Sequence, residues 1–361
     1  MLFTPGRIGS LILPNRLVRS ATAERMADEK GFPKPEFEAL YTELAQGGVG
    51  LIITGHMYVA QGGKCHEEMT GIYNDELIPA LTRLTKAVHE EGGKIATQIN
   101  HGGGNSSSET VTEAIAPSTA GELYFKRSAR AMTEKEIEES IQAYAQAAHR
   151  AKEAGFDAVQ IHGAHGYLIN QFTSPLTNKR NDQWGGNIQN RTRFLRKVCQ
   201  AVREQVGDDY PLFIKFGIVD GLEGGLSSDE GMQNIAQFIE MGLDAVEISG
   251  GVQYQSIQKC IRKPEEEGYF LPLIRETRPF TDLPILAVGG FRSRVVMERA
   301  LLSGAADFIS LCRPLIREPG LPKRFQSGEQ EKAACISANN CWPQKMGVGI
   351  ACKCPSLPEN V

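Results

Sequence analysis

The strongest constraint on the fold is a pattern that recurs along the chain, in which an amphipathic helix ends at glycine and a short apolar strand follows. Glycine at a helix end adopts the left-handed conformation that turns the chain back. Nearly continuous apolar strands are typical of parallel sheets whose faces are covered by helices. The pattern predicts strands at residues 49–54, 94–99, 156–161, 243–248 and 306–311.

Three further apolar runs complete a set of eight predicted strands, at residues 16–20, 211–216 and 284–288. Helices are predicted between them, for example over 134–154 and 188–206. Alternating strands and helices with right-handed crossovers leave an open doubly wound sheet or a closed barrel. Eight strand–helix units favour the barrel, so we predict an α/β fold of the (β/α)₈ TIM barrel type.

The chain shows no low-complexity linker, and its 361 residues fit one barrel of this kind. We expect the barrel to cover residues 1–325 and a cysteine-containing extension, 326–361, to pack on it. The loop over 102–130 is rich in Gly, Ser and Thr. Loops of that length are often lids or substrate-binding segments.

The charge balance excludes two classes of partner. Lys and Arg number 39 and Asp and Glu number 43, so the net charge is −4. This balance lacks the excess of basic residues that is typical of proteins that bind nucleic acid or an anionic membrane. The first ten residues lack a signal-peptide pattern, and no apolar run approaches the ~20 residues that span a bilayer. We expect a cytoplasmic protein with a small-molecule substrate, and a homodimer only because two-fold assemblies are common.

Polar and small residues gather where the predicted strands end, and a (β/α)₈ barrel builds its active site from those ends. This concentration indicates a ligand site. The residues that follow strands one to eight in order are Ser20 to Glu24, Thr54 to His56, Gln98 to His101, His162 to Tyr167, Lys215, Ser249 to Gly251, Gly289 with Gly290, and Cys312 to Pro314.

The glycines after the last strands point to a phosphate site. Loops after strands seven and eight often bind phosphate in this fold. A phosphate needs backbone N–H groups at close range, which glycine permits, and Arg313 can add a charge-assisted hydrogen bond. The alternative is that Gly289 and Gly290 form only a tight turn.

Lys215 is a cation inside an apolar stretch. An unpaired buried ammonium is costly, so Lys215 needs an anionic partner. The negatively charged N1–C2 edge of a reduced flavin is one candidate, and a salt bridge to Glu247 is the other.

His162 and His165 lie three residues apart as the chain leaves a strand. Such a pair can bind a metal, stabilise an oxyanion or cap local structure, and no histidine-rich metal motif accompanies it. Tyr167 favours a catalytic role for the pair over a structural one. Two neutral hydrogen-bond donors beside a phenol form a set that can polarise and protonate a carbonyl compound.

The same region resembles the signature of the old yellow enzyme family. The resemblance rests on residues 162–168, 174–178 and 180–186, and continues through 190–194. Further similarity covers about residues 1–325. It is found at residues 2–5, 13–16, 71–76, 98–103, 287–290 and 313–315.

The resemblance implies non-covalent FMN and assigns roles to individual residues. Gln98 and Lys215 would hydrogen-bond the isoalloxazine ring, and Ala21, Thr22 and Ala23 would meet its reactive edge. Contacts to the rest of the cofactor are implied for Gly55, His162, Gly250, Gly289, Gly290, Cys312 and Arg313, the last five at the phosphate.

The implied reaction has two halves. NADH or NADPH would pass a hydride to flavin N5, and the reduced flavin would pass it to the β-carbon of an activated alkene. His162 and His165 would hold the carbonyl or nitro oxygen of the substrate, and Tyr167 would protonate the α-carbon.

Three positions depart from the family pattern. Ala23 stands where relatives often carry a Thr or Cys that tunes the flavin potential. His56 follows Gly55 where many carry a Glu-Ala pair, so we expect an imidazole in the pocket. Gly104 replaces an Arg that often follows the strand-three motif.

Four of the eight cysteines crowd into the C-terminal extension, at Cys335, Cys341, Cys352 and Cys354. The segment resembles the cluster-binding segment of longer relatives such as dienoyl-CoA reductases, which continue into a second nucleotide-binding domain. Ala338 stands at the expected second ligand, and Cys354 could replace it. A [4Fe–4S] cluster, a zinc site and a degenerate remnant are the three hypotheses. Ordinary thiols are expected at Cys65, Cys199, Cys260 and Cys312.

Other functions are also compatible with these residues. One is an Fe–S-assisted dienoyl-CoA-type reductase or a dehydrogenase that works with a redox partner. Another is a flavin-binding sensor barrel, which the set of His162, His165 and Tyr167 argues against. A third is a flavin-free aldolase-like barrel with Lys215 as a Schiff-base nucleophile.

Overall fold

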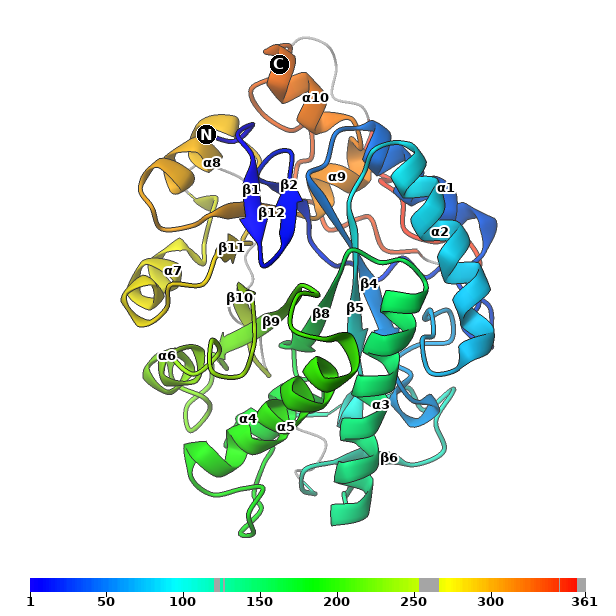
Figure 1. Cartoon of the computed structure of the whole chain (residues 1–361), viewed down its shortest axis with the longest axis vertical. Helices are drawn as coiled ribbons and strands as arrows, with labels where there is room; N and C mark the ends of the chain where they lie inside the picture. Colours follow the sequence, from blue (N-terminus) through cyan, green and yellow to red (C-terminus); the bar gives the residue numbers. More distant parts are fainter. Residues whose placement is uncertain (120–123, 126, 253–265, 344, 356–361) are drawn as a thin grey trace.

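The computed structural model describes residues 1–119, 124–125, 127–252, 266–343 and 345–355, and its centre is a closed barrel of eight parallel strands (Figure 1). The eight predicted strands all lie in this barrel, which confirms the (β/α)₈ fold. In barrel order they are β3 (Leu17–Arg19), β4 (Leu51–Tyr58), β5 (Ile95–Asn100), β8 (Ala158–Gly163), β9 (Leu212–Val219), β10 (Ala245–Gly250), β11 (Ile285–Ala287) and β12 (Phe308–Leu311).

Helices surround the barrel (Figure 1). The longest two had been predicted from periodicity, and α5 has the expected bounds while α3 ends one residue early. The helices are α1 (Pro35–Gln46), α2 (Ile78–Glu90), α3 (Glu134–Glu153), α4 (Leu168–Thr173), α5 (Ile188–Val206), α6 (Ser228–Ile235), α7 (Leu271–Thr277), α8 (Arg294–Leu302), α9 (Arg313–Arg317) and α10 (Leu321–Ser327).

The glycines at helix ends have the left-handed backbone that the pattern predicts. Gly48 after α1 has a φ of +83°, Gly92 after α2 has +73°, and Gly155 after α3 has +83°. In each case the chain reverses and enters the next strand within a few residues. These turns set the short loops at the N-terminal ends of the strands and leave the longer loops for the opposite, C-terminal rim.

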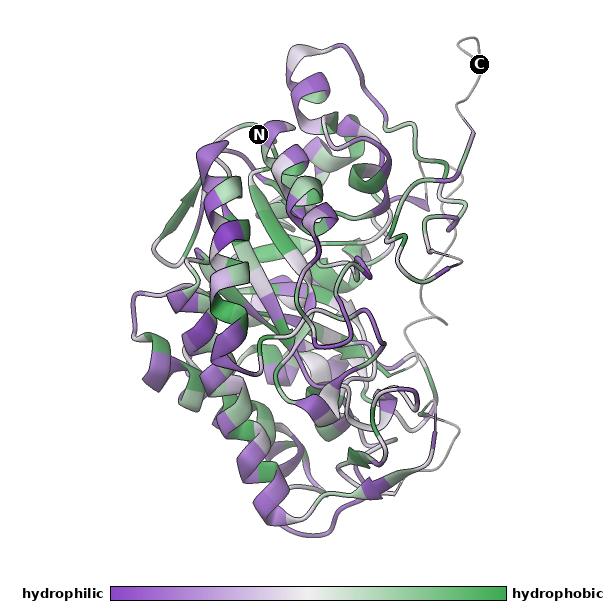
Figure 2. Ribbon diagram, turned by 90° about the vertical axis from the view of Figure 1, so that its right-hand side faces the viewer, coloured by the Kyte–Doolittle hydropathy of each residue, from purple (hydrophilic) through white to green (hydrophobic). Residues whose placement is uncertain are grey.

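The barrel is filled by side chains and is plugged at one end by an N-terminal hairpin. This hairpin, β1 (Gly6–Ile8) paired antiparallel with β2 (Leu11–Leu13), was not predicted. Figure 2 shows the hydrophobic colour concentrated on the central strands and the hydrophilic colour on the outer helices. The hairpin packs against one interior cluster made of Val18, Leu51, Ile53, Ala96, Ala158, Phe213, Ala245, Leu286 and Phe308.

The excursion after β5 contains two short strands, β6 (Ala114–Ala116) and β7 (Ala129–Ala131), which pair in parallel. Phe125 packs with them in a small cluster of its own. Asn105 ties the excursion to the loop after β8, because its side-chain amide donates to the Gly166 carbonyl at 2.7 Å. Residues 120–123 and 126 lie outside the described residues, and the lid role of this loop stays a prediction. Within the described ranges, the structure contains no helix with the length and apolar character to cross a membrane.

Replacing Gly92 by alanine tests the left-handed helix ends. A Cβ at Gly92 meets nothing within 4 Å, so the substitution adds backbone strain without a clash. We expect Gly92→Ala to lower the free energy of unfolding by about 1 kcal/mol, measured by urea denaturation.

Gly62→Ala is the matched control. Its backbone is not left-handed, and the nearest atom to a Cβ there is His101 Nε2 at 4.0 Å. The control should change the free energy of unfolding by less than about 0.5 kcal/mol. An equal loss in both variants would contradict the role assigned to the helix-end conformation.

Candidate active site

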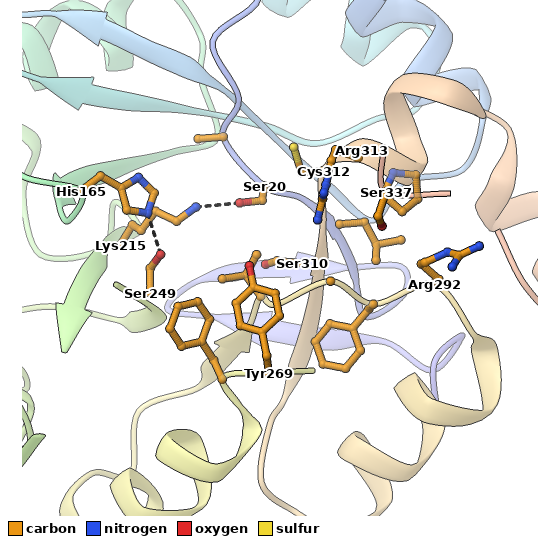
Figure 3. Close-up of a pocket in the computed structure, with 17 residues that line it drawn as sticks. Ser20, His165, Lys215, Ser249, Tyr269, Arg292, Ser310, Cys312, Arg313 and Ser337 are labelled. Atoms are coloured by element: carbon orange, nitrogen blue, oxygen red, sulfur yellow. Dashed lines mark hydrogen bonds between the residues drawn. The ribbon is translucent and has the colours of Figure 1, made fainter. Parts of the chain in front are cut away.

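Two adjoining cavities open at the C-terminal rim of the barrel, with volumes of about 170 and 330 Å³. We call them the inner cavity and the outer cavity respectively. Figure 3 shows the inner cavity, with Lys215 and His165 at one end and Arg292 and Ser337 at the other. The cavities share the walls made by Ala21, His165, Lys215, Cys312 and Arg313.

The interior side chains change from apolar to polar toward this rim along several strands. On β9, Phe213 belongs to the interior apolar cluster and Lys215, two residues on, lines the cavity. On β12, Phe308 is followed in the same way by Ser310. Because alternate residues of a strand face the same side, such strands contribute an apolar floor and a polar layer above it.

Lys215 lies in this polar layer and is 3% exposed. Its Nζ donates to Ser20 Oγ at 2.7 Å and forms an ion pair with Glu247 Oε2 at 3.3 Å. Lys215 and Glu247 are direct register partners on the neighbouring strands β9 and β10. The salt bridge that the sequence left as one of two alternatives is therefore present, and Lys215 also lines both cavities.

Glu247 is completely buried and accepts further hydrogen bonds. Ser20 Oγ donates to its Oε1 at 2.7 Å, and Gln160 Nε2 donates to its Oε2 at 2.9 Å. Gln98 Nε2 in turn donates to Gln160 Oε1 at 2.7 Å. A buried carboxylate is tolerated when it is paired and fully hydrogen-bonded, and this chain of contacts meets that condition.

The loop after β8 turns sharply and brings the two predicted histidines together. His165 and Gly166 have left-handed backbones, with φ values of +60° and +74°. The His165 backbone N–H donates to the Gly250 carbonyl at 3.1 Å, and His165 Nε2 lies 2.7 Å from Ser249 Oγ. The rings of His162 and His165 then stand 5.2 Å apart at an interplanar angle of 81°.

Both histidines are neutral in this environment. Burial, together with nearby His165, His56 and Lys215, lowers the pKa of His162 well below its ordinary value. Burial and Lys215 likewise lower the pKa of His165 well below its ordinary value. His162 Nδ1 accepts the Ala164 backbone N–H at 3.3 Å, so its Nε2 carries the hydrogen and acts as a donor.

Tyr167 and His56 complete the outer cavity with His162. The Tyr167 ring lies 4.9 Å from the His162 ring and 5.1 Å from the His56 ring, measured between centroids. Asn100 Nδ2 lies 2.8 Å from His56 Nδ1 and orients that imidazole. The expected imidazole at position 56 therefore does line the cavity.

The end of the inner cavity away from Lys215 has the features of an anion site. Arg292 lies at this end, and Arg313, Gly290 and Ser310 line the same cavity. Among the residues that the structure describes, Arg292 Nε and Ser310 Oγ are buried without a hydrogen-bond partner. Buried polar groups normally find partners, so these two atoms fit a ligand that carries acceptor oxygens.

The structure brings together most of the residues predicted for the site. Gly55, Gly250 and Gly289 are not in the lining of either cavity. The Gly55 N–H instead donates to Glu24 Oε1 at 2.5 Å, and the Gly289 carbonyl accepts the Gly268 N–H at 2.7 Å. The predicted residues that do line the cavities are Ala21, Thr22, Ala23, Gln98, His162, His165, Tyr167, Lys215, Gly290, Cys312 and Arg313.

Two departures from the family pattern have a steric explanation. A Cβ at Gly55 would lie 2.2 Å from Glu24 Oε2, because the buried Glu24 carboxylate occupies the space beside it. A Cβ at Gly104 would lie 2.6 Å from the Phe125 ring. In both places a side chain from elsewhere in the chain fills the room that a larger residue would need.

Sequence reasoning missed several lining residues, among them Arg292, Ser310 and Trp342. Ser310 lies two residues after Phe308 on a strand that was correctly predicted. Interior alternation along that strand would have found it. Trp342 had no such signal, because the segment that carries it has no regular structure.

The C-terminal cysteines do not form a metal-binding geometry in the part of the chain that is described, where no group of three or more His, Cys, Asp or Glu side chains could hold a metal ion. Burial raises the pKa of Cys341 to about 11 and raises that of Cys335 above its ordinary value. Cys352 Sγ instead lies 3.4 Å from a guanidinium nitrogen of Arg317. Cys65 and Cys199 are buried free thiols, and Cys260 lies outside the described residues.

Comparison with known proteins matches residues 1–332 to the NADH:flavin oxidoreductase / NADH oxidase family. The chain is 37% identical to an NADPH dehydrogenase of Geobacillus sp. (strain WCH70), over 94% of this chain and 96% of that protein. It is 36% identical to an NADH oxidase of Thermoanaerobacter brockii, over 94% of this chain but only 52% of that protein. This chain therefore spans about half the length of the latter relative.

A solved structure with a similar fold is the old yellow enzyme homologue from Zymomonas mobilis. The superposition has a TM-score of 0.79 at 28% identity and covers 93% of this chain and 95% of that one.

Glu247→Gln tests the buried ion pair. The substitution leaves the Lys215 ammonium buried without its charge partner, and we expect the free energy of unfolding to fall by about 3–5 kcal/mol. The double variant Lys215→Met/Glu247→Gln should lose clearly less free energy of unfolding than the single variants Lys215→Met and Glu247→Gln lose in sum. Urea denaturation of all four proteins measures the coupling, and additivity within about 0.5 kcal/mol would contradict the pair.

Proposed function

Because the chain belongs to the NADH:flavin oxidoreductase / NADH oxidase family, we propose that it is an FMN-dependent oxidoreductase that reduces activated alkenes at the expense of NADH or NADPH. Membership confirms the resemblance to the old yellow enzyme family. The proposed substrates are α,β-unsaturated carbonyl or nitro compounds. The observation that carries the proposal is a continuous rim site with cationic groups at one end and neutral hydrogen-bond donors at the other.

The residues present fit FMN. The unpartnered Ser310 Oγ and Arg292 Nε, with Arg313 and Gly290, would hold the phosphate. Gln98 and Lys215 would hold the ring. An ammonium has three hydrogens, and the described contacts of Lys215 to Ser20 and Glu247 use two, which leaves one for a ligand.

Bound FMN supplies hydride transfer, and the side chains of the outer cavity supply orientation and a proton. His162 donates from Nε2, and His165 stands beside it, so the pair would bind one substrate oxygen and polarise the group that carries it. The low pKa of each ring keeps both neutral near pH 7. The hydroxyl of Tyr167, whose ring packs against that of His162, would deliver the proton to the substrate carbon.

His56 narrows the outer cavity in this chain. Its ring packs 5.1 Å from Tyr167 and 5.9 Å from His162, and Asn100 fixes it. We propose that this third imidazole restricts the site to compact, planar substrates.

The aldolase alternative loses support from the same geometry. A protonated Schiff base at Lys215 would keep a single N–H, so the lysine could not keep both its ion pair with Glu247 and its hydrogen bond to Ser20. The Fe–S-assisted reductase alternative needs an iron–sulfur cluster. Among the described C-terminal residues, no group of side chains has a metal-binding geometry.

Arg313→Ala tests the phosphate end. Removing one charge-assisted contact to a phosphate should weaken FMN binding by about 10- to 100-fold, measured by quenching of flavin fluorescence on titration of the apoprotein. Riboflavin, which lacks the phosphate, is the matched ligand, and its affinity should change less than about threefold. Equal weakening of both ligands would assign Arg313 to another part of the cofactor.

Tyr167→Phe tests the proton donor. In anaerobic stopped-flow, NADH or NADPH first bleaches the flavin of the holoenzyme, and cyclohexenone, maleimide or a nitroalkene then restores its colour. Loss of a general acid typically costs about 10²–10⁴-fold in the step that needs the proton. We expect the alkene step to slow by that order and the bleaching step to change little.

Tyr73→Phe is the matched tyrosine control, because its hydroxyl contacts the Lys30 carbonyl at 3.2 Å and does not line either cavity. It should leave both steps unchanged. Equal slowing of the two steps in Tyr167→Phe would refute the assignment of Tyr167 as proton donor.

A further inference from the structure

The C-terminal segment, defined here as residues 335–343 and 345–352, lies along the rim of the site. Figure 2 shows this part of the chain alongside the barrel, toward the C-terminal end of the chain. Ser337 lines the inner cavity, and four other residues of the segment line the outer one. Those four are Asn339, Cys341, Trp342 and Ile350. A segment whose cysteines suggested metal binding thus contributes its own side chains to the candidate cofactor site.

Residues after Trp342 attach the segment to the barrel by hydrogen bonds. The Ile350 N–H donates to the Glu24 carbonyl at 2.9 Å, in the loop after the first barrel strand. The Gly347 N–H donates to the Glu68 carboxylate. The Ala351 N–H donates to the Cys341 carbonyl at 3.2 Å and closes the segment on itself. The loop that carries Glu24 also contributes Thr22 and Ala23 to the outer cavity, so the segment is held next to that cavity.

Arg25 supports Trp342 directly. The Arg25 guanidinium lies over the indole, 5.6 Å from the ring centroid, and its Nε lies 3.5 Å from Glu68 Oε2. Arg25 has a left-handed backbone, with a φ of +56°, a conformation that is strained for an L-residue. The cation–π contact orients the indole at the cavity wall, and the ion pair with Glu68 holds the guanidinium in place.

Asn339 makes a second link to the proposed cofactor site. Its side-chain oxygen accepts a hydrogen bond from Arg313, the residue that would bind the phosphate. Asn339 also has a left-handed backbone, with a φ of +57°, a conformation that asparagine tolerates better than most residues. The segment therefore orients a guanidinium that both cavities share.

We propose that residues 335–343 and 345–352 form the outer wall of the FMN site, with Trp342 as a residue that contacts the bound flavin and Asn339 as a positioning residue for Arg313. The proposal rests on the proposed function, because it takes FMN as the occupant. Trp342 is 50% exposed at the cavity wall. Covering a large apolar side chain releases free energy, so a ligand that covers the indole would bind more tightly. A planar aromatic ring is the occupant that suits an indole, because offset stacking adds to the burial of apolar area.

The intrinsic fluorescence of the full-length apoprotein tests the contact without any substitution. The chain contains two tryptophans, and Trp184 is 5% exposed, so acrylamide reaches chiefly Trp342. Saturation with FMN should lower the Stern–Volmer quenching constant at least twofold. An unchanged quenching constant in protein that has bound FMN would overturn the proposal.

Substitutions test the energetic contribution of the wall. Trp342→Ala should raise the dissociation constant of FMN about tenfold, and Trp342→Phe, which keeps an aromatic ring, should recover most of that loss. Asn339→Ala should raise the dissociation constant of FMN about fivefold while changing that of riboflavin less than twofold, because it acts through Arg313. Circular dichroism and the thermal midpoint of each variant confirm that it is folded.

Val348→Ala is the matched control, because Val348 lies in the same segment, is 59% exposed and lines neither cavity. Its affinity for FMN should match the wild type. If Trp342→Ala binds FMN as tightly as Val348→Ala, the wall role is refuted while FMN binding stands. If Trp342→Ala changes only the KM for NADPH or alkene, Trp342 belongs to the substrate side and the proposal is likewise overturned. Wild-type protein that fails to bind FMN would overturn the proposed function and this inference together.

Discussion

The buried ion pair between Lys215 and Glu247 determines how the rest of the site is arranged. A charge inside a barrel is tolerated only when its partner and all its hydrogen bonds are in place. Neighbouring parallel strands in register provide the partner, and Ser20 and Gln160 provide the hydrogen bonds. The pair marks the level at which the barrel interior changes from an apolar floor to a polar layer.

The electrostatics of the two cavities differ because their surroundings differ. At the inner end, two guanidinium groups and unpartnered polar atoms suit an anion. At the outer end, burial and neighbouring positive or titratable groups lower the pKa of His162 and His165, so the two imidazoles stay neutral and do not repel each other. One continuous rim can therefore hold a phosphate at one end and polarise an uncharged substrate at the other.

Closure of the barrel brings distant parts of the chain into one wall. The last strand, β12, pairs with the first, β3, so Cys312 Sγ comes within 3.0 Å of Thr22 Oγ1. Thr22 Oγ1 also donates to the Ser20 carbonyl at 3.0 Å, so the Cys312 thiol acts as donor to Thr22. The C-terminal segment then joins the same loop through Glu24. Residues near both ends of the chain thus form the site together.

The sequence by itself determined the eight strands, the helix-end turns and the strand-end residues, because these depend on local periodicity and on glycine conformation. It left open whether Lys215 pairs with Glu247, and it did not indicate the N-terminal hairpin plug or the wall position of Trp342. Those features depend on contacts between residues far apart in sequence, such as Ser20 with Glu247 at a separation of 227. Only barrel closure decides which of these residues meet, because register and packing across strands are set by the whole fold and not by any one segment.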